Sequence, residues 1–178
     1  MNAPSNLPST VPPDDLQRKL TLARPNDDPR LPHISIAGDT YTILVAGKDT
    51  AGRYCLIDMV VPPGGGPPPH RHDFEEMFTL LEGEIEFTFR GATSIVRAGE
   101  TVNIPANAPH SFRNASGHPV RLLCMGSPAG LDEFFMLVGD PVESRTSPPP
   151  SLGDTEKAER MRKAVTLAPQ FRTELLAP

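Results

Sequence analysis

The sequence has no excess of positive charge and no long apolar run. It carries 17 Lys and Arg against 22 Asp and Glu, a formal net charge of −5, so it has no basic surplus with which to neutralise a phosphate backbone or anionic lipid. No apolar stretch approaches the ~20 residues of a membrane-spanning helix, and the N-terminus lacks the features of a secretory signal. We therefore expect a cytoplasmic protein that binds neither nucleic acid nor membranes.

Cysteine is scarce, with only Cys55 and Cys124 in the chain. The two residues are far apart in sequence, and each lies within an apolar segment. Cysteines in such a setting behave as small buried hydrophobic residues. We expect two buried free thiols, with a disulfide as the alternative.

Proline and glycine are abundant instead, with 22 and 14 residues among 178, so long helices cannot dominate the fold. The length suits one domain with tails. Residues 1–33 are predicted to be a Pro-rich arm with at most a turn or two of helix at 15–20. Residues 34–139 form the predicted domain, and residues 140–178 a Pro-rich loop followed by a helix, Thr155–Leu167, that packs on it.

The predicted domain is all-β, because short runs rich in Val, Ile, Thr, Phe and Tyr alternate with turn signals. The predicted strands are Ile34–Ile36, Thr40–Val45, Tyr54–Val61, Glu75–Leu81, Glu84–Arg90, Ala92–Val96, Thr101–Ile104, His110–Asn114 and Val120–Met125. This many short strands at this spacing indicate a sandwich or a barrel. A short helix at Gly130–Leu137 is expected to close it, and no helix pair remains for reading DNA.

Three of the five histidines lie close together in the sequence. Residues i and i+2 of a strand share a face, so His70, His72 and Glu76 project together, whereas Glu75 points the other way. A carboxylate among apolar side chains is costly unless a cation compensates it, and a divalent metal ion is the simplest cation. For any one histidine taken alone, a hydrogen-bonded core position is the alternative.

Four further polar residues are predicted to have no part in a site. His33 and His118 each stand next to a proline in a predicted loop, and we expect both at the surface. Arg113 and Arg121 are expected to be solvated rather than to clamp a substrate. No inward side chain near the histidines other than Glu76 is predicted to act as a base.

The spacing of these residues resembles that of the cupin family. The first matching motif is Gly64-x₅-His70-x-His72-x₃-Glu76-x₆-Gly83, and the second is Gly99-x₅-Pro105-x-Asn107-x₂-His110-x₃-Asn114. Asn107 stands where the family usually has Gly, and Asn is the non-Gly residue that best tolerates the left-handed region.

The resemblance implies a cupin jelly-roll β-barrel that forms a homodimer. It also implies one divalent metal ion (Fe, Mn, Ni, Co, Cu or Zn) with His70, His72, Glu76 and His110 as its ligands. Met77, Thr79 and Leu81 would then lie on the opposite face of their strand, where a second chain or the arm could cover them.

Such a ligand set defines what the site can do. Three neutral imidazoles and one carboxylate leave a divalent ion with a charge of about +1 and open positions that favour an anionic oxygen donor. The ion can act as a Lewis acid, hold an enolate or phenolate beside dioxygen, or polarise a carbonyl for isomerisation. Glu76 is either a ligand only or also a catalytic base that takes a proton from a bound hydroxyl.

The substrate pocket is predicted to be apolar, which suits a flat or apolar oxygen-bearing molecule better than a sugar nucleotide. Its candidate lining is Met59, Phe74, Phe78, Leu80, Phe112 and Met125, with plain core filling as the alternative for each.

The segments that enter and leave the site are similar to those of bacterial quercetin 2,3-dioxygenase-like cupins. The leading hypothesis is therefore a metal-dependent dioxygenase that acts on an enolic or phenolic small molecule, either flavonol-like or diketone-like. The alternatives are a non-catalytic cupin that binds a metabolite at the same metal and a metal-assisted isomerase or decarboxylase.

Overall fold

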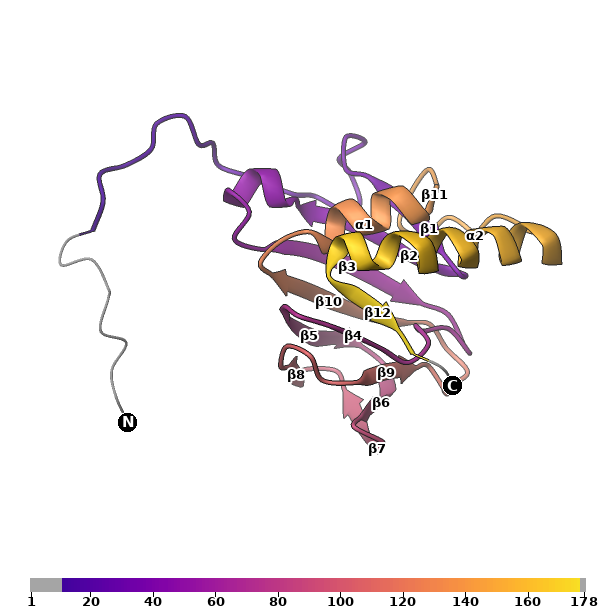
Figure 1. The fold of residues 1–178 in the computed structure, drawn as a ribbon. Helices are drawn as coiled ribbons and strands as arrows, with labels where there is room; N and C mark the ends of the chain where they lie inside the picture. Colours follow the sequence, from indigo (N-terminus) through magenta and orange to yellow (C-terminus); the bar gives the residue numbers. More distant parts are fainter. Residues whose placement is uncertain (1–10, 177–178) are drawn as a thin grey trace, which may run out of the picture.

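Two antiparallel sheets enclose the core in the computed structural model, which describes residues 11–176 (Figure 1). The larger sheet has the order β11-β1-β2-β3-β10-β5-β8, and the smaller has the order β12-β4-β9-β6-β7. The larger contains β1 (His33–Ile36), β2 (Asp39–Val45), β3 (Cys55–Val61), β5 (Glu75–Glu82), β8 (Thr101–Ile104), β10 (Val120–Ser127) and β11 (Asp140–Pro141). The smaller contains β4 (His70–His72), β6 (Glu84–Phe89), β7 (Ala92–Arg97), β9 (His110–Arg113) and β12 (Thr173–Leu175). The predicted all-β jelly roll is confirmed.

The strands form because apolar residues recur at every second position. In β10 the buried residues Val120, Leu122 and Cys124 alternate with half-buried ones, and this alternation turns one face of the strand into the barrel. Cys55 on β3 and Cys124 on β10 are both buried and free, as predicted.

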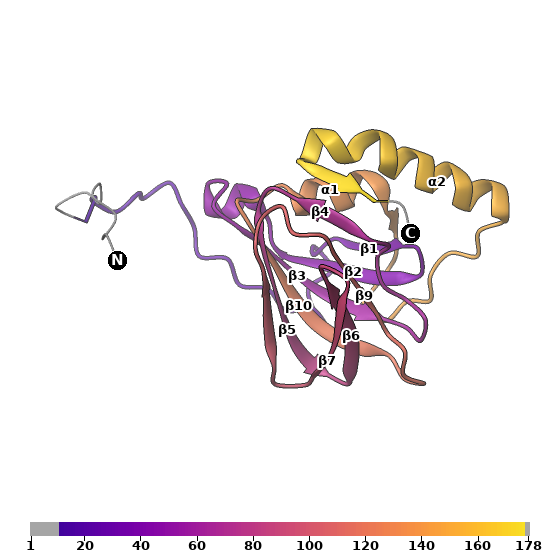
Figure 2. The same ribbon diagram turned by 60° about the horizontal axis from the view of Figure 1, so that its bottom comes forward.

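The helices lie together over one end of the barrel (Figure 2). Helix α1 (Leu131–Val138) buries Leu131, Phe134 and Val138, and its position agrees with the prediction. Helix α2 (Asp154–Leu167) also lies where the sequence predicts a helix, but it has no fully buried residue. None of the described helices is long and apolar enough to cross a bilayer.

The C-terminal segment returns to the barrel after α2, which the sequence did not predict. A short 3₁₀ helix, η2 (Ala168–Phe171), leads into β12, which pairs with β4 so that Thr173 lies opposite His72. The pairing includes an ion pair of 2.6 Å between Arg71 and Glu174. A strand of three residues has too short a pattern to be recognised, so its existence depends on the edge that β4 offers.

Two further segments test local predictions. Residues 15–20 contain only a turn, within the limit predicted for the arm, because so short a helix is marginal in water without a surface to pack on. Residues 140–141 form β11 and pair with Ser35 and Ile34 of β1, where a loop was predicted. The first described residues extend away from the barrel, and a 3₁₀ helix, η1 (Gly47–Thr50), lies where they meet it (Figure 1).

The outer face of the larger sheet carries a buried polar group of side chains. His33 is buried, with Nδ1 2.8 Å from the Thr42 hydroxyl, so its predicted surface position is wrong. Arg121 donates from Nε and Nη2 to the buried Asp58 carboxylate at 3.0 and 2.8 Å, and is therefore held rather than solvated. The loop containing Arg145 covers this face, with Nη1 3.8 Å from Asp58.

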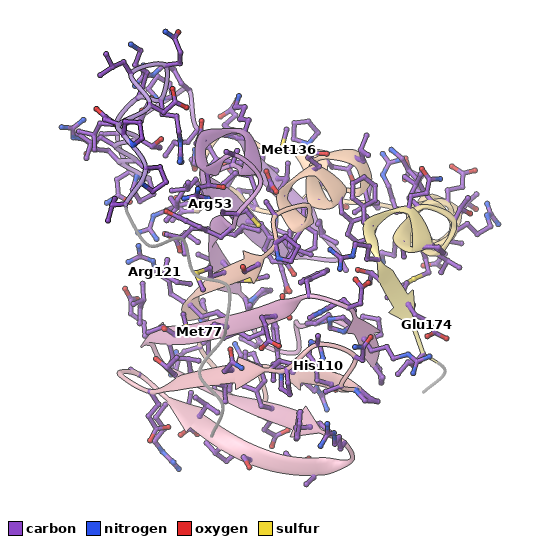
Figure 3. The ribbon with its side chains drawn as sticks, turned by 60° about the vertical axis from the view of Figure 1, so that its left-hand side comes forward. Arg53, Met77, His110, Arg121, Met136 and Glu174 are labelled. Atoms are coloured by element: carbon purple, nitrogen blue, oxygen red, sulfur yellow. The ribbon has the colours of Figure 1, made fainter. Side chains whose placement is uncertain are left out.

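The two remaining polar predictions agree with the structure. His118 and Arg113 are both exposed. The outer side of the larger sheet, with Arg121 and Met77, lies well away from Glu174 at the C-terminal strand (Figure 3).

Candidate metal centre

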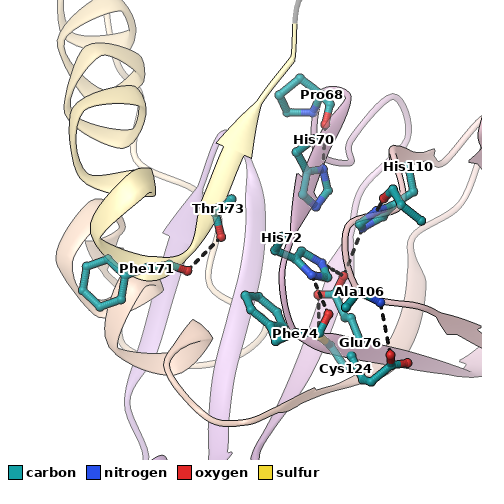
Figure 4. A network of polar contacts seen from close by, with 12 residues as sticks. Pro68, His70, His72, Phe74, Glu76, Ala106, His110, Cys124, Phe171 and Thr173 are labelled. Atoms are coloured by element: carbon teal, nitrogen blue, oxygen red, sulfur yellow. Dashed lines mark hydrogen bonds and ion pairs between the residues drawn. The ribbon is translucent and has the colours of Figure 1, made fainter.

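The four predicted metal ligands converge inside the barrel from three strands. His70 and His72 come from β4, Glu76 from the inner face of β5, and His110 from β9, where it pairs directly with His70. One ligand atom from each residue lies within 4.8 Å of those of the other three. Figure 4 shows the three imidazole rings arranged around the Glu76 carboxylate.

Two backbone features hold β4 in place beside the other strands. Asn107 has a φ of 69°, the left-handed conformation predicted for it, and its amide donates to the His72 carbonyl at 2.6 Å. Gly66 has a φ of 121°, and a Cβ there would collide with the Phe112 carbonyl. The glycine therefore lets the loop before β4 pass directly over β9.

The second nitrogen of each ring fixes the orientation of the first. Each Nδ1 lies 2.9 Å from a backbone carbonyl oxygen, which can only accept a hydrogen bond, so each Nδ1 carries the proton. The carbonyls belong to Pro68 for His70, to Phe74 for His72 and to Ala108 for His110. The three Nε2 lone pairs are thereby free to bind a cation.

Glu76 lies at the focus of these rings. Its Oε2 is 3.0 Å from His72 Nε2 and 3.1 Å from His110 Nε2. Burial opposes the charged form of Glu76, but the His110 and His72 rings beside Oε2 hold the pKa of this carboxyl well below its ordinary value. Burial also lowers the pKa of His70 to about 4, with a further contribution from His110. The carboxylate is ionised and the first histidine neutral at neutral pH.

The donor set fits a divalent metal ion. It consists of three imidazole nitrogens and one ionised carboxylate oxygen, all buried or half-buried, with no permanent cation paired to the carboxylate among the described residues. A buried anion in such a place requires a compensating cation. The cluster can therefore hold a metal ion.

Cys124 completes the surroundings of Glu76 in a way that the sequence pattern did not indicate. Its thiol donates to Oε1 of Glu76 at 3.2 Å, which leaves Oε2 directed at the histidines. Burial and the neighbouring Glu76 carboxylate keep the pKa of this thiol well above its ordinary value, so the sulfur acts as a donor and not as a thiolate ligand.

A cavity of about 130 Å³ opens beside the cluster. Three of the six predicted pocket residues line it, namely Met59, Phe78 and Phe112. The C-terminal segment also contributes to its wall, through Met161, Ala164, Thr173 and Leu175.

The other three predicted pocket residues lie outside this lining. Phe74 stacks flat on His72, with ring centroids 3.8 Å apart, and so supports a ligand instead of a substrate. Leu80 is buried deeper in the core. Met125 is half-buried on the outer face of β10, because Cys124 takes the inward position of that strand. The pairing of a strand with its neighbours sets which of its residues face the barrel interior, and spacing along the chain did not reveal this pairing.

Two polar residues of the cavity wall were missed by the sequence reading. Asp39 and Tyr41 are both buried and line the cavity, so the prediction that no other inward base lies near the site is wrong. Asp39 lies just outside the predicted strand Thr40–Val45, whereas β2 begins at Asp39. Strand alternation could have found both residues, because Asp39 and Tyr41 lie on the same face of β2 as the buried Ile43.

Comparison with known proteins agrees with this geometry. The family model described as a cupin domain matches residues 57–126. The matched segment, which contains all four predicted ligands, is a cupin domain.

Individual relatives differ in activity. The chain is 27% identical over 128 residues to a quercetin 2,3-dioxygenase of Bacillus subtilis, covering 71% of this chain but 37% of that protein. It is 29% identical over 111 residues to the dimethylsulfoniopropionate lyase DddW of Ruegeria pomeroyi, covering 54% and 73% of the two chains. Its fold is similar to that of an RmlC-like cupin from Shewanella frigidimarina, with 16% identity, a TM-score of 0.51 and coverage of 64% and 99%. The chain thus spans little more than a third of the dioxygenase.

Proposed function

We propose that His70, His72, Glu76 and His110 hold one divalent metal ion and that the protein is a dioxygenase for a compact enolic substrate. The observation that carries the proposal is the convergence of three free Nε2 atoms and one ionised Oε2 on a single point beside an apolar cavity. The ion would supply Lewis acidity that stabilises an anionic substrate oxygen.

The chain's own residues select and orient the substrate. Met59, Phe78 and Phe112 give the cavity an apolar wall that excludes water from the bound molecule. A cavity of about 130 Å³ is similar in size to the ~150 Å³ engineered cavity that admits benzene. The size therefore favours a diketone-like substrate over a flavonol-like one, which would require the C-terminal segment to move.

Glu76 is the proposed catalytic base as well as a ligand. An enolic hydroxyl must lose its proton to become the anionic donor that the site favours. Oε2 of Glu76 lies where the three rings meet, and Glu76 would accept that proton by swinging off the ion. The ligand-only role remains the alternative outcome.

The test is oxygen uptake by the metal-loaded protein with a panel of small 1,3-diketones. We expect dioxygen consumption in step with substrate loss, and a fall in turnover on the order of 10²–10⁴ for Glu76→Gln at equal metal occupancy. Parent-level turnover by metal-loaded Glu76→Gln would show that Glu76 is a ligand only. Substrate binding with no oxygen uptake and no product would favour the non-catalytic binding protein.

A second candidate reaction is a metal-assisted lyase or decarboxylase reaction, which consumes no dioxygen. The additional buried carboxyl of Asp39 in the cavity favours it, because proton transfer at a second position then has a local partner. The relative that carries the name of a lyase supports it further. Product formation under strictly anaerobic conditions would select this reaction over the dioxygenase.

The assembly and location of the protein remain predictions. A homodimer in the cytoplasm is proposed, with Leu81 exposed and Met77 half-buried on the outer face of β5. Light scattering at micromolar concentration measures the assembly directly, and the mass of a single chain would contradict the dimer.

A further inference from the structure

A second polar feature lies in the wall of the same cavity, apart from the metal cluster. Asp39 is 2% exposed, and its Oδ2 accepts a hydrogen bond from the Tyr41 hydroxyl at 3.2 Å. Its Oδ1 is buried and has no hydrogen-bond partner within the described part of the chain. Both residues line the cavity. Asp39 therefore lines the same cavity as the metal cluster and has one carboxyl oxygen without a hydrogen-bond partner among the described residues.

Burial of the Asp39 carboxyl lowers the stability of the fold, and the backbone beside it has a glycine that makes room for it. An unpaired buried carboxyl oxygen destabilises the fold, and burial raises the pKa of Asp39 to about 7, despite the opposing hydrogen bond from Tyr41. No Lys or Arg within the described residues forms an ion pair with Asp39. A Cβ at position 65 would collide with Oδ1, so Gly65 leaves room for it.

We propose that Asp39, oriented by Tyr41, binds a hydroxyl group of the substrate while the metal cluster binds the substrate's anionic oxygen. This inference rests on the proposed function, because it places the anionic end of the molecule at the cluster. The substrate class becomes a compact hydroxylated enolic molecule with two polar ends and an apolar middle.

A hydroxyl suits this carboxyl because it both donates and accepts, so it pairs with the carboxyl in either protonation state. Tyr41 keeps its proton, because burial and the Asp39 carboxylate raise its pKa well above the ordinary value, and it therefore stays a donor to Oδ2.

The experiment compares two probes that differ only at the far end. The full chain is loaded with Co²⁺ and titrated with acetohydroxamate and with its hydroxymethyl analogue, glycolohydroxamate, while the visible spectrum of the ion is followed. Both probes offer the same anionic oxygen pair to the metal. We expect the parent to bind glycolohydroxamate about tenfold more tightly, as a hydrogen bond to a charged group predicts.

Variants then assign the preference to Asp39. Asp39→Ala should bind the two probes equally well, Asp39→Asn should recover part of the preference, and the exposed Asp154→Ala control should keep the parent's ratio. Equal binding by the parent would overturn the inference whether or not any variant folds, and so would a preference that survives in Asp39→Ala. A parent that binds neither Co²⁺ nor hydroxamate would instead overturn the proposed function, and the inference with it.

Discussion

Two buried carboxylates on opposite faces of the larger sheet have different kinds of partner. Asp58 on the outer face of β3 is paired with Arg121, a permanent cation of the chain itself. Glu76 on the inner face of β5 is surrounded by imidazole rings whose Nε2 lone pairs point at it. The first group is complete as it stands, whereas the second is complete only with a cation from outside. Burial of a carboxylate thus does not by itself indicate a metal site. The groups that surround the carboxylate distinguish a structural ion pair from a candidate metal site.

The first prediction concerns loss of the ion pair between Asp58 and Arg121. Arg121→Ala should lower the free energy of unfolding by roughly 3 kcal/mol, because it leaves a fully buried carboxylate with only the more distant Arg145. The exposed Arg113→Ala is the matched control and should stay within about 0.5 kcal/mol of the parent. Chemical denaturation measures both, and equal values for the two variants would show that the Asp58 pair contributes nothing.

The second prediction concerns loss of one histidine from the cluster around Glu76. His72→Ala should weaken divalent metal binding by more than the ~10–100-fold that loss of an outer hydrogen-bond partner costs, because it removes a ligand itself. His118→Ala, an exposed histidine outside the cluster, should bind as the parent does. Competition with a chelator gives both affinities, and undiminished binding by His72→Ala would remove this residue from the ligand set.

The third prediction concerns Asp39, which belongs to neither pattern because no Lys or Arg of residues 11–176 pairs with it. Its pKa of about 7 lies above the ordinary 3.8, so the parent loses stability as pH rises and the native carboxyl must ionise. Asp39→Asn cannot ionise, and its stability relative to the parent should increase by about 2 kcal/mol between pH 5 and pH 8. Denaturation curves at both pH values measure this, and a constant difference would mean that Asp39 is not buried unpaired.

The smallest effect is expected at Cys124. Replacing it with Ala removes the donor to Oε1 of Glu76 and should weaken metal binding by about tenfold, the lower end of what an outer partner contributes. Cys124→Ser retains a donor and should recover part of the affinity. An affinity unchanged in the alanine variant would mean that packing alone orients Glu76.

The convergence of His70, His72, Glu76 and His110 was predictable from the sequence because it follows from strand alternation and motif spacing. Alternation along β4 places His70 and His72 on one face, and motif spacing adds His110. The expectation that Glu76 continues the same strand is wrong, because Glu76 lies on β5 of the other sheet and reaches the histidines across the barrel. The left-handed turn at Asn107 followed from the chemistry of one residue type. These features depend on the few residues around them, and local rules describe them well.

The cavity wall was harder to predict because it depends on long-range pairing. On β10, Cys124 faces the barrel interior and Met125 faces outward, opposite to the pocket position predicted for Met125. The strand β12 forms because β4 has a free edge with which it pairs. His33 became buried because a loop from residues 142–147 covers the outer face. Alternation with Ile43 places Asp39 on the inner face of β2, but Asp is a residue type that favours turns, so the sequence alone favours a loop at this position.

A crystal grown without added metal, measured for anomalous scattering at the absorption edges of the candidate metals, tests the metal centre most directly. The geometry predicts one strong peak between Oε2 of Glu76 and the Nε2 atoms of His70, His72 and His110, and the edge identifies the element. A crystal with no peak at this position, even after soaking with Mn²⁺, Co²⁺ and Zn²⁺, would contradict the proposed metal site.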